Sequence, residues 1–137
     1  MTRIASVEPH SSVKYGLGVT TPNEMAQLFV LLAQGKTVSP TADSTILSIL
    51  ANNEDNSKLT RNTYGTRLAH KSGDVDASHT DCSVLSLPAS VVALVVACVV
   101  ACVVACVLTK ANTDTRCWVD AEGNAVIGRI GEAIVKA

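Results

Sequence analysis

Three consecutive residues, Lys71, Ser72 and Gly73, have the chemistry needed to bind an anionic ligand. A lysine supplies a fixed positive charge that can pair with a carboxylate, and a serine hydroxyl can donate a hydrogen bond to the same group. The glycine leaves room for a ligand to lie along the backbone. A reaction at such a site also needs a nucleophile, which another part of the chain has to supply.

One pattern matches a serine nucleophile with a lysine as its base. Residues 11–14 read Ser-Ser-Val-Lys, which has the Ser-x-x-Lys spacing. However, Gly16, Gly18 and Pro22 follow almost at once, so no long apolar helix can carry the pattern. We interpret the match as a coincidence, which leaves the sequence without a recognisable nucleophile.

The composition argues against nucleic-acid and metal binding. The net charge is −1 and aromatic residues make up 3% of the chain, so neither a basic face for phosphates nor a surface for base stacking is available. His10, His70 and His79 are dispersed, and three of the five cysteines recur every fourth residue in an apolar run. These spacings are not typical of zinc sites, so we expect no metal and no other cofactor.

Two short helices are expected in the first third of the chain. Thr21 precedes Pro22, and Glu24 lies three residues after Thr21, a combination typical of a helix start. Apolar residues then recur at i, i+3, i+4 and i+7, at Met25, Leu28, Phe29 and Leu32. The pair Ser39-Pro40 repeats the start pattern, and the second helix should end near Asn52.

Strands and a final helix are expected after the helix pair. Residues 54–62 are polar and predict a surface loop. Residues 66–71 and 81–87 have strand-like composition and would pair antiparallel across a polar turn at 74–80. Residues 123–137 space their apolar side chains at helical intervals, which predicts a closing amphipathic helix.

Residues 89–108 form an uncharged apolar run in which Val-Val-Ala-Cys occurs three times. A run of roughly twenty apolar residues can span a bilayer as a helix, which would make the chain a small single-span membrane protein. Valine favours strands, however, although ordinary strands have only about 5 to 6 residues. We favour a strand lengthened by repeat expansion and keep the membrane helix as the alternative.

The order of these segments resembles the carboxy-terminal portion of class A β-lactamases and their penicillin-recognising serine-hydrolase relatives. Residues 15–26, with Thr-Thr-Pro before a helix, are similar to a stretch that opens a late helix in those enzymes. Residues 69–73, Ala-His-Lys-Ser-Gly, are similar to their Lys-Thr/Ser-Gly box on an inner strand. Residues 81–88 and 107–110 look like the next two strands, and residues 127–137 look like the last helix.

This resemblance implies an α+β fold, in which an antiparallel sheet with flanking helices forms part of a β-lactamase/transpeptidase-like domain. We expect residues 1–137 to be a single partial domain. Residues 1–53 would hold the helix pair, and residues 64–137 the strands and the carboxy-terminal helix, with the low-complexity run at 89–108.

The resemblance also implies a site and a reaction. Lys71 would be an accessory catalytic residue, and Ser72 and Gly73 would bind substrate, in an enzyme that hydrolyses β-lactams or cyclic amides through an acyl-serine. Neither a Ser-Asp-Asn loop nor an equivalent of the loop glutamate is recognisable. We therefore expect a truncated relative that is inactive by itself, with a β-lactam-like small molecule as the ligand of the family.

Half of such a fold would leave apolar surface uncovered, so we expect self-association or a complementary fragment. Members of the family are usually secreted or periplasmic. Residues 1–10 carry one positive charge but no apolar segment of the kind found in signal peptides, so the sequence leaves the location open.

Overall fold

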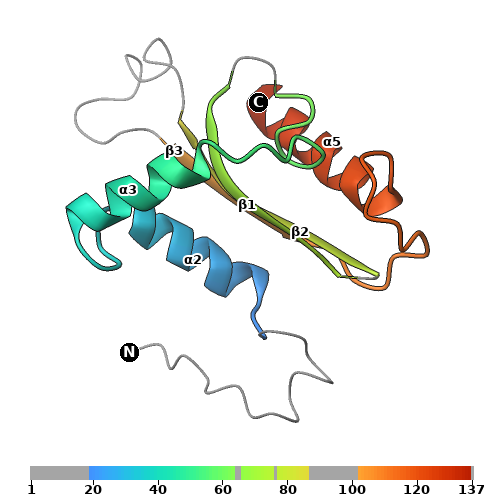
Figure 1. Cartoon of the computed structure of the whole chain (residues 1–137), viewed down its shortest axis with the longest axis horizontal. Coiled ribbons are helices and arrows are strands. Elements are labelled where there is room, and N and C mark those ends of the chain that lie inside the picture. Colours follow the sequence, from blue (N-terminus) through green and yellow to red (C-terminus); the bar gives the residue numbers. More distant parts are fainter. Residues whose placement is uncertain (1–18, 64–65, 76, 87–101, 137) are drawn as a thin grey trace.

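The chain folds as a three-stranded antiparallel sheet between two layers of helices (Figure 1). The computed structural model describes residues 19–63, 66–75, 77–86 and 102–136. The strands lie in the order β1-β2-β3 and comprise β1 (Leu68–Val75), β2 (Ser78–Ser86) and β3 (Cys102–Leu108). The predicted α+β class with an antiparallel sheet is therefore confirmed.

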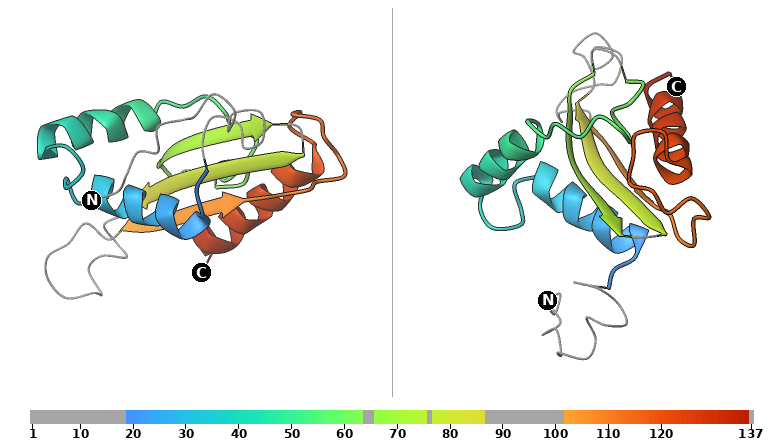
Figure 2. Two further views of the ribbon diagram at one scale, coloured as in Figure 1. Left: turned by 90° about the horizontal axis from the view of Figure 1, so that it is seen from below. Right: turned by 45° about the vertical axis from the view of Figure 1, so that its right-hand side comes forward.

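The helices cover opposite faces of this sheet. They are α2 (Pro22–Ala33), α3 (Pro40–Leu50) and α5 (Glu122–Lys136). The two further views show the sheet with α2 and α3 on one side and α5 on the other (Figure 2). Helix α2 contacts β2 and β3, α3 contacts β1, and α5 contacts β2. The sheet is thus the middle layer.

Local sequence fixes both ends of α2 and the start of α3. The Thr21 hydroxyl accepts a hydrogen bond from the Glu24 amide at 3.2 Å, while the Thr21 amide donates to the Glu24 carboxylate at 2.8 Å. Ser39 likewise accepts from the Ala42 amide, at 3.2 Å. Just beyond α2, Gly35 has φ = 67°, a conformation that glycine adopts without a steric penalty. The predicted helix starts are confirmed.

The first two strands are longer than predicted, and the polar turn predicted at 74–80 is wrong. Asp74 pairs with His79 and Val75 with Ser78, so the two strands stay paired through most of the segment predicted as a turn. The prediction failed because it took polar residues as evidence of a turn. In the structure the polar side chains at these strand ends form hydrogen bonds and ion pairs, described below, so the strands can continue through them.

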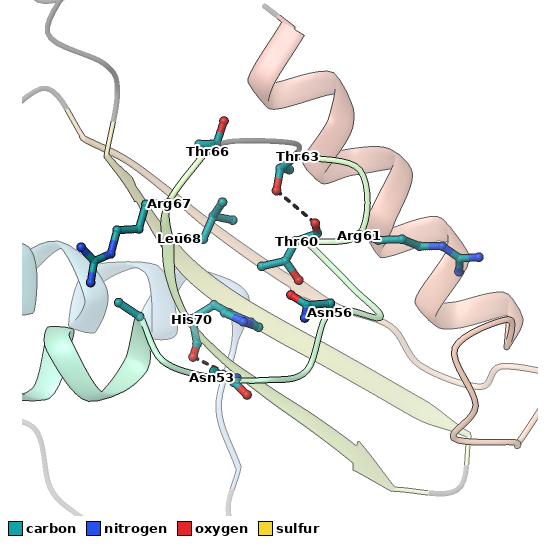
Figure 3. A pocket seen from close by; sticks show the side chains of 10 residues that line it. Asn53, Asn56, Thr60, Arg61, Thr63, Thr66, Arg67, Leu68 and His70 are labelled. Carbon is teal, nitrogen blue, oxygen red and sulfur yellow. Dashed lines mark hydrogen bonds between the residues drawn. The ribbon is translucent and has the colours of Figure 1, made fainter.

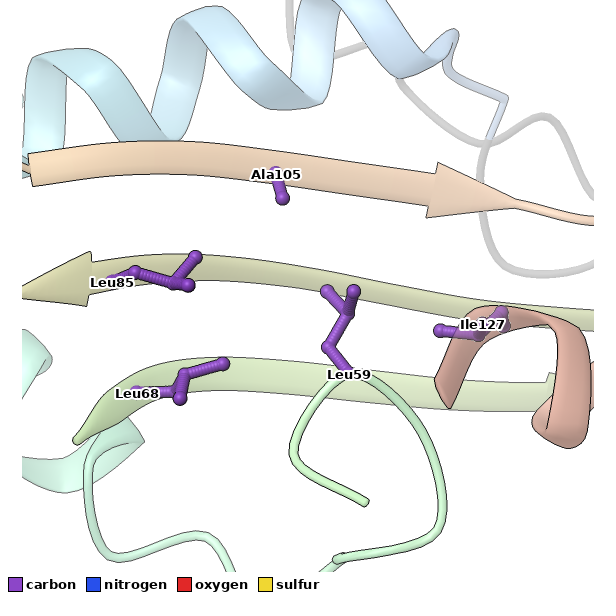
Figure 4. Packing of buried hydrophobic residues seen from close by; sticks show 5 residues of the cluster. All are labelled: Leu59, Leu68, Leu85, Ala105 and Ile127. Atoms are coloured by element: carbon purple, nitrogen blue, oxygen red, sulfur yellow. The ribbon is translucent and has the colours of Figure 1, made fainter. Parts of the chain in front are cut away.

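The predicted loop after α3 is present, but its middle is buried rather than on the surface. Lys58 and Leu59 are both 0% exposed. Leu59 belongs to a core cluster between the sheet and α5, together with Leu68, Leu85, Ala105 and Ile127 (Figure 4). The loop therefore acts as part of the layer that covers this face of the sheet.

Close packing of this loop against α5 depends on glycine. A Cβ atom added to Gly131 would lie 2.2 Å from the carbonyl oxygen of Leu59, which real contacts do not allow. Near the start of the helix, a Cβ atom on Gly123 would lie 2.5 Å from Cδ2 of His79. Side chains at these two positions would push the helix away from the loop and the sheet.

A second core cluster lies on the opposite face, between the sheet and α2 and α3. Its buried members are Phe29, Cys82 and Val84. Partly buried side chains from both helices and from β3 pack against them. Alternate residues of β2 and β3 thus enter two separate cores, as expected for a sheet covered on both sides.

The apolar run is described only at its end. Residues 102–108 form β3, which pairs with β2 along its length, so this part of the run is a strand as we favoured. The preceding part, to residue 101, lies outside the described residues. Among the helices that the structure describes, none has the length and hydropathy needed to cross a membrane.

Candidate functional site

The predicted site tripeptide lies within β1, at an outer position of the sheet formed by the described strands. Lys71 is opposite Cys82, Ser72 is opposite Asp81, and Gly73 is opposite Thr80. Lys71 is exposed, and its Nζ atom donates a hydrogen bond to the backbone oxygen of Ser72. The tripeptide therefore lies on an edge strand of the sheet that the described residues form.

Neighbouring residues of this tripeptide face opposite sides of the sheet. Lys71 shares its side with Cys82, which belongs to the core beneath α2. Ser72 shares its side with His70 and Asp74, and the carboxylate of Asp55 in the loop before β1 lies near it. Lys71 thus faces the side of α2 and α3, whereas the Ser72 hydroxyl faces the buried loop.

A buried carboxylate lies directly behind the tripeptide. Oδ1 of Asp81 is 3.1 Å from Nδ1 of His70, and Oδ2 accepts a hydrogen bond of 3.0 Å from the amide of Leu59. Both side chains are almost fully buried. This arrangement fixes the loop residue Leu59 to the central strand and orients the imidazole of His70.

A buried lysine forms a second polar group on the same side. Nζ of Lys58 lies 2.9 Å from Oδ2 of Asp55 and 3.0 Å from Oδ2 of Asp74, and the lysine side chain is only 1% exposed. The other oxygen of Asp74 lies 2.6 Å from Nδ1 of His79, whose ring is fully buried. We call the four residues Asp55, Lys58, Asp74 and His79 the buried polar network beneath β1.

Within this buried polar network, hydrogen bonds and charges shift the pKa values of Asp55 and Lys58 more than burial does. Burial by itself would raise the pKa of Asp55, but hydrogen bonds from Ser57 and Lys58 hold it well below its usual range. Burial would lower the pKa of Lys58, yet hydrogen bonds to Asp55 and Asp74, together with their charges, raise it. Asp55 and Lys58 therefore remain charged near neutral pH.

A hollow of about 430 Å³ lies beside β1, but it does not contain the tripeptide. Asn56, Thr60 and Leu68 line it, and the side chains of Arg61 and Arg67 point away from it (Figure 3). The Arg61 guanidinium instead donates a hydrogen bond of 2.6 Å to the carbonyl of Val119. The lining of this hollow therefore combines neutral polar groups with His70 and with the stems of the two arginines.

The outer surface of α2 and α3 is unusually apolar. Leu31 is 43% exposed and Ile49 is 66% exposed. A groove of about 460 Å³ runs along α2 and is lined by Ala26, Val30 and Leu31 with polar neighbours. These side chains lie on the same side of the sheet as Lys71.

The sequence analysis did not predict the buried polar network or the Asp81–His70 pair. One signal was available, because polar residues occupy every second position at 70, 72 and 74 and again at 79, 81 and 83. That alternation predicts a polar face on two strands. Nothing local indicates that Lys58 is buried, since its partner Asp74 is 16 residues away.

Two further expectations concern the nucleophile and a metal site. The Ser-x-x-Lys match at residues 11–14 lies outside the described residues. Within the described part of the chain, no three or more His, Cys, Asp or Glu side chains form a group that could hold a metal ion.

Comparison with known families identifies the fold. A sequence model described as the Beta-lactamase enzyme family matches residues 2–137. The chain belongs to the beta-lactamase enzyme family. A search of curated proteins finds no significant match.

Solved structures of the beta-lactamase fold agree with this assignment. PBP-A is 22% identical with a TM-score of 0.70, covering 88% of this chain and 40% of PBP-A. A β-lactamase from Sphaerobacter thermophilus DSM 20745 is 22% identical with a TM-score of 0.67, covering 85% of this chain and 40% of that protein. A β-lactamase from Chitinophaga pinensis DSM 2588 is 20% identical with a TM-score of 0.68, covering 93% of this chain and 45% of that protein. The chain thus spans less than half the length of these structures.

Proposed function

We propose that this chain is the substrate-binding edge of a serine β-lactamase-like hydrolase. In the complete fold, the enzyme would open a β-lactam or a related cyclic amide through an acyl-serine. Lys71 would act as the accessory catalytic residue, and Ser72 and Gly73 would bind the substrate. The 137 residues would act as a single partial domain and would not catalyse the reaction alone.

The observation that supports this proposal best is the position of Lys71. Its ammonium group is exposed, lies on the outer strand, and makes no ion pair within the described residues. It is therefore available to a ligand carboxylate. Gly73 is two residues further along the same strand, where an added Cβ atom would lie 3.0 Å from the hydroxyl oxygen of Thr80.

The substrate class comes from the relatives. A mutant of PBP-A in an acyl-enzyme complex with penicillin G has a TM-score of 0.71 with this chain at 22% identity, covering 94% of this chain and 43% of that protein. A penicillin carries one carboxylate, which suits a lysine and a hydroxyl. Rotation of Ser72 about χ1 would turn its hydroxyl from Asp55 toward the strand edge.

Binding of benzylpenicillin, followed by amide NMR shifts, tests the role of the tripeptide. We expect weak binding, with a dissociation constant on the order of 1 mM, and shifts centred on residues 71–73. Lys71→Ala should weaken binding several-fold, and the matched control Lys110→Ala, also an exposed lysine near a strand end, should not. Equal binding by both variants would refute the assignment.

Mass spectrometry tests the absence of a nucleophile. Incubation of the chain with benzylpenicillin should leave its mass unchanged, because we interpret the one Ser-x-x-Lys match in the sequence, at residues 11–14, as a coincidence. A covalent adduct on Ser11 or Ser12 would show that the Ser-x-x-Lys match is functional and would overturn this part of the proposal.

We also propose that the apolar face of α2 and α3 is covered by the part of the fold that carries the nucleophile. The solved structures extend well beyond the portion that matches this chain. The exposed leucine and isoleucine side chains lie on the same side as Lys71, where such a part would have to meet the substrate. Without it, this face would promote self-association.

Analytical ultracentrifugation tests this second proposal. The chain alone should sediment as more than a monomer, and Leu31→Glu should shift it toward the monomer because a charge cannot be buried in an apolar contact. Arg129→Glu, on the exposed side of α5, is the matched control and should not change the assembly. A monomer in all three cases would contradict the proposal.

A further inference from the structure

The cysteines on β2 and β3 include one pair that lies directly opposite in the strand register. Cys82 is the partner of Cys106, and both are free thiols. Cys82 is buried, Cys106 is partly buried, and both belong to the core beneath α2. We propose that Cys82 and Cys106 are a cross-strand disulfide site, closed reversibly by exchange with a small-molecule disulfide.

The hydrogen-bond pattern shows which type of pair this is. The Thr109 amide donates to the His79 carbonyl at 2.8 Å, so His79 and Thr109 form a hydrogen-bonded pair in the same register. Hydrogen-bonded and non-hydrogen-bonded pairs alternate along an antiparallel ladder. Counting three residues along each strand makes Cys82 and Cys106 a non-hydrogen-bonded pair.

This type of pair has a geometry compatible with a disulfide. Directly opposite Cα atoms are about 4.5 Å apart in non-hydrogen-bonded pairs, and their side chains are closer than in the other type. Disulfides accept Cα separations of about 4.4 to 6.8 Å. The bond can therefore form with small side-chain rotations and little movement of the backbone.

The other cysteines in the described part of the chain are not placed to compete. Cys102 is opposite Ser86, four residues along β3 from Cys106, which is roughly 13 Å at the usual rise of a strand. Cys117 is exposed in the segment before α5. The folded chain therefore favours one pairing among these four thiols.

The exchange reaction balances in two steps with a disulfide such as oxidised glutathione. The thiol of Cys106, which is the more accessible, loses its proton and attacks one sulfur of the small disulfide, releasing one small thiol and leaving a mixed disulfide. The thiolate of Cys82 then attacks Sγ of Cys106 and releases the second small thiol. Two protein thiols are oxidised, and one small disulfide is reduced to two thiols.

Burial sets the pace of this reaction. It raises the pKa of Cys82, and the Cys106 thiol and the charge of Asp81 raise it further. Burial also raises the pKa of Cys106. Because the thiolate is the nucleophile, closure should be slow at neutral pH and faster in mildly alkaline solution.

The bond would fix the alignment of two strands in a repetitive sequence. Because Val-Val-Ala-Cys recurs every four residues, a shift of β3 by four would put Cys102 opposite Cys82 and keep every side chain on its own face. A disulfide at 82–106 would prevent that shift. Lys71 is the register partner of Cys82 on β1, so the bond would lie next to the strand that carries the proposed site.

Peptide mapping of the oxidised chain tests the proposal. The reduced chain is incubated with oxidised glutathione at mildly alkaline pH, alkylated and digested without reduction, in buffer and in concentrated urea. We expect the 82–106 linkage to dominate in buffer and to become one of several in urea. Dithiothreitol should reverse it, and the thermal midpoint should be higher for the oxidised chain.

Two variants and three results decide the outcome. Cys106→Ser should abolish the linkage, and Cys117→Ser, which changes an exposed thiol, should retain it. A dominant 82–102 linkage would show a different register and overturn the proposal. A glutathione adduct that stays on Cys106, or equal pairing in buffer and in urea, would overturn it too. This test does not depend on the proposed hydrolase function, because it needs no substrate.

Discussion

The ammonium nitrogen of Lys58 lies 3.0 Å from the carboxylate of Asp74, although the two residues are 16 positions apart and the lysine side chain is 1% exposed. This ion pair joins the loop before the sheet to the far end of β1. Since β1 also carries Lys71, the shape of the proposed binding edge depends on a charge buried behind it.

Replacing Lys58 by methionine should destabilise the chain. The substitution keeps the length of the side chain but leaves Asp55 and Asp74 without their cation. Breaking a fully buried pair costs about 3 to 5 kcal/mol, and partial exposure of these carboxylates reduces the expected loss to about 2 kcal/mol. Urea unfolding measures it.

The matched control for this substitution is Lys110→Met, which removes an exposed lysine. It should change the free energy of unfolding by no more than about 0.5 kcal/mol. Similar losses in both variants would mean that Lys58 makes no special contribution.

Stability should fall in acid, partly through Asp55. Because the folded chain lowers the pKa of this carboxyl, its contribution is complete above the pKa of the unfolded state, about 4, and is lost as the pH falls toward the folded value. Asp55→Asn should therefore be less stable than the original at neutral pH, and the difference should shrink between about pH 5 and pH 2.

Urea midpoints measured across this range give the comparison. Glu54→Gln is the control, since Glu54 is exposed and makes no ion pair within the described residues. Its difference from the original should stay small at every pH. A difference for Asp55→Asn that does not vary with pH would contradict the assigned role.

Alanine at Gly131 should destabilise α5 packing although alanine is the better helix former. The added methyl group would meet the Leu59 carbonyl, and overpacking of this kind costs about 1 to 3 kcal/mol, more than the gain in helix propensity of about 1 kcal/mol. Thermal unfolding followed by circular dichroism measures the loss.

Gly128 in the same helix provides the comparison. A Cβ atom there would first meet Cδ of Arg61 at 3.0 Å, the middle of a flexible side chain. Gly128→Ala should therefore cost clearly less than Gly131→Ala. The reverse order would show that the loop does not lie on α5 as described.

Removing the Thr21 hydroxyl should weaken the start of α2. Thr21→Ala loses the hydrogen bond to the Glu24 amide, and loss of such a cap costs about 1 kcal/mol. Thr20→Ala removes a neighbouring hydroxyl that makes only contacts of 3.4 Å, and should cost less. Equal losses in urea unfolding would contradict the capping role.

The sequence predicts the features of this fold that depend on short-range chemistry. Thr21, Ser39 and the two prolines fix the helix starts through contacts within three residues, so their positions can be inferred without the structure. The order of segments around Lys71 predicts the family in the same way, because each segment keeps a recognisable local pattern.

Features that depend on distant partners could not be predicted. The strands continue through Asp74 and His79 because these side chains bond to each other and Asp74 also accepts a hydrogen bond from Lys58. The residues around Lys58 have the composition of a surface loop. The burial of Lys58 is explained by its ion pair with Asp74, which lies far away in the sequence. Polar residues with long-range partners are thus the reason why the loop and the strand ends differ from expectation.

Because side chains alternate along β1, neighbouring residues of this strand lie in different environments. A change at position 70 alters the buried side of the sheet, whereas a change at position 71 alters the exposed side, where we propose that a ligand binds. If Lys71 binds a ligand as we propose, selectivity and thermal tolerance can vary independently through single substitutions at neighbouring codons.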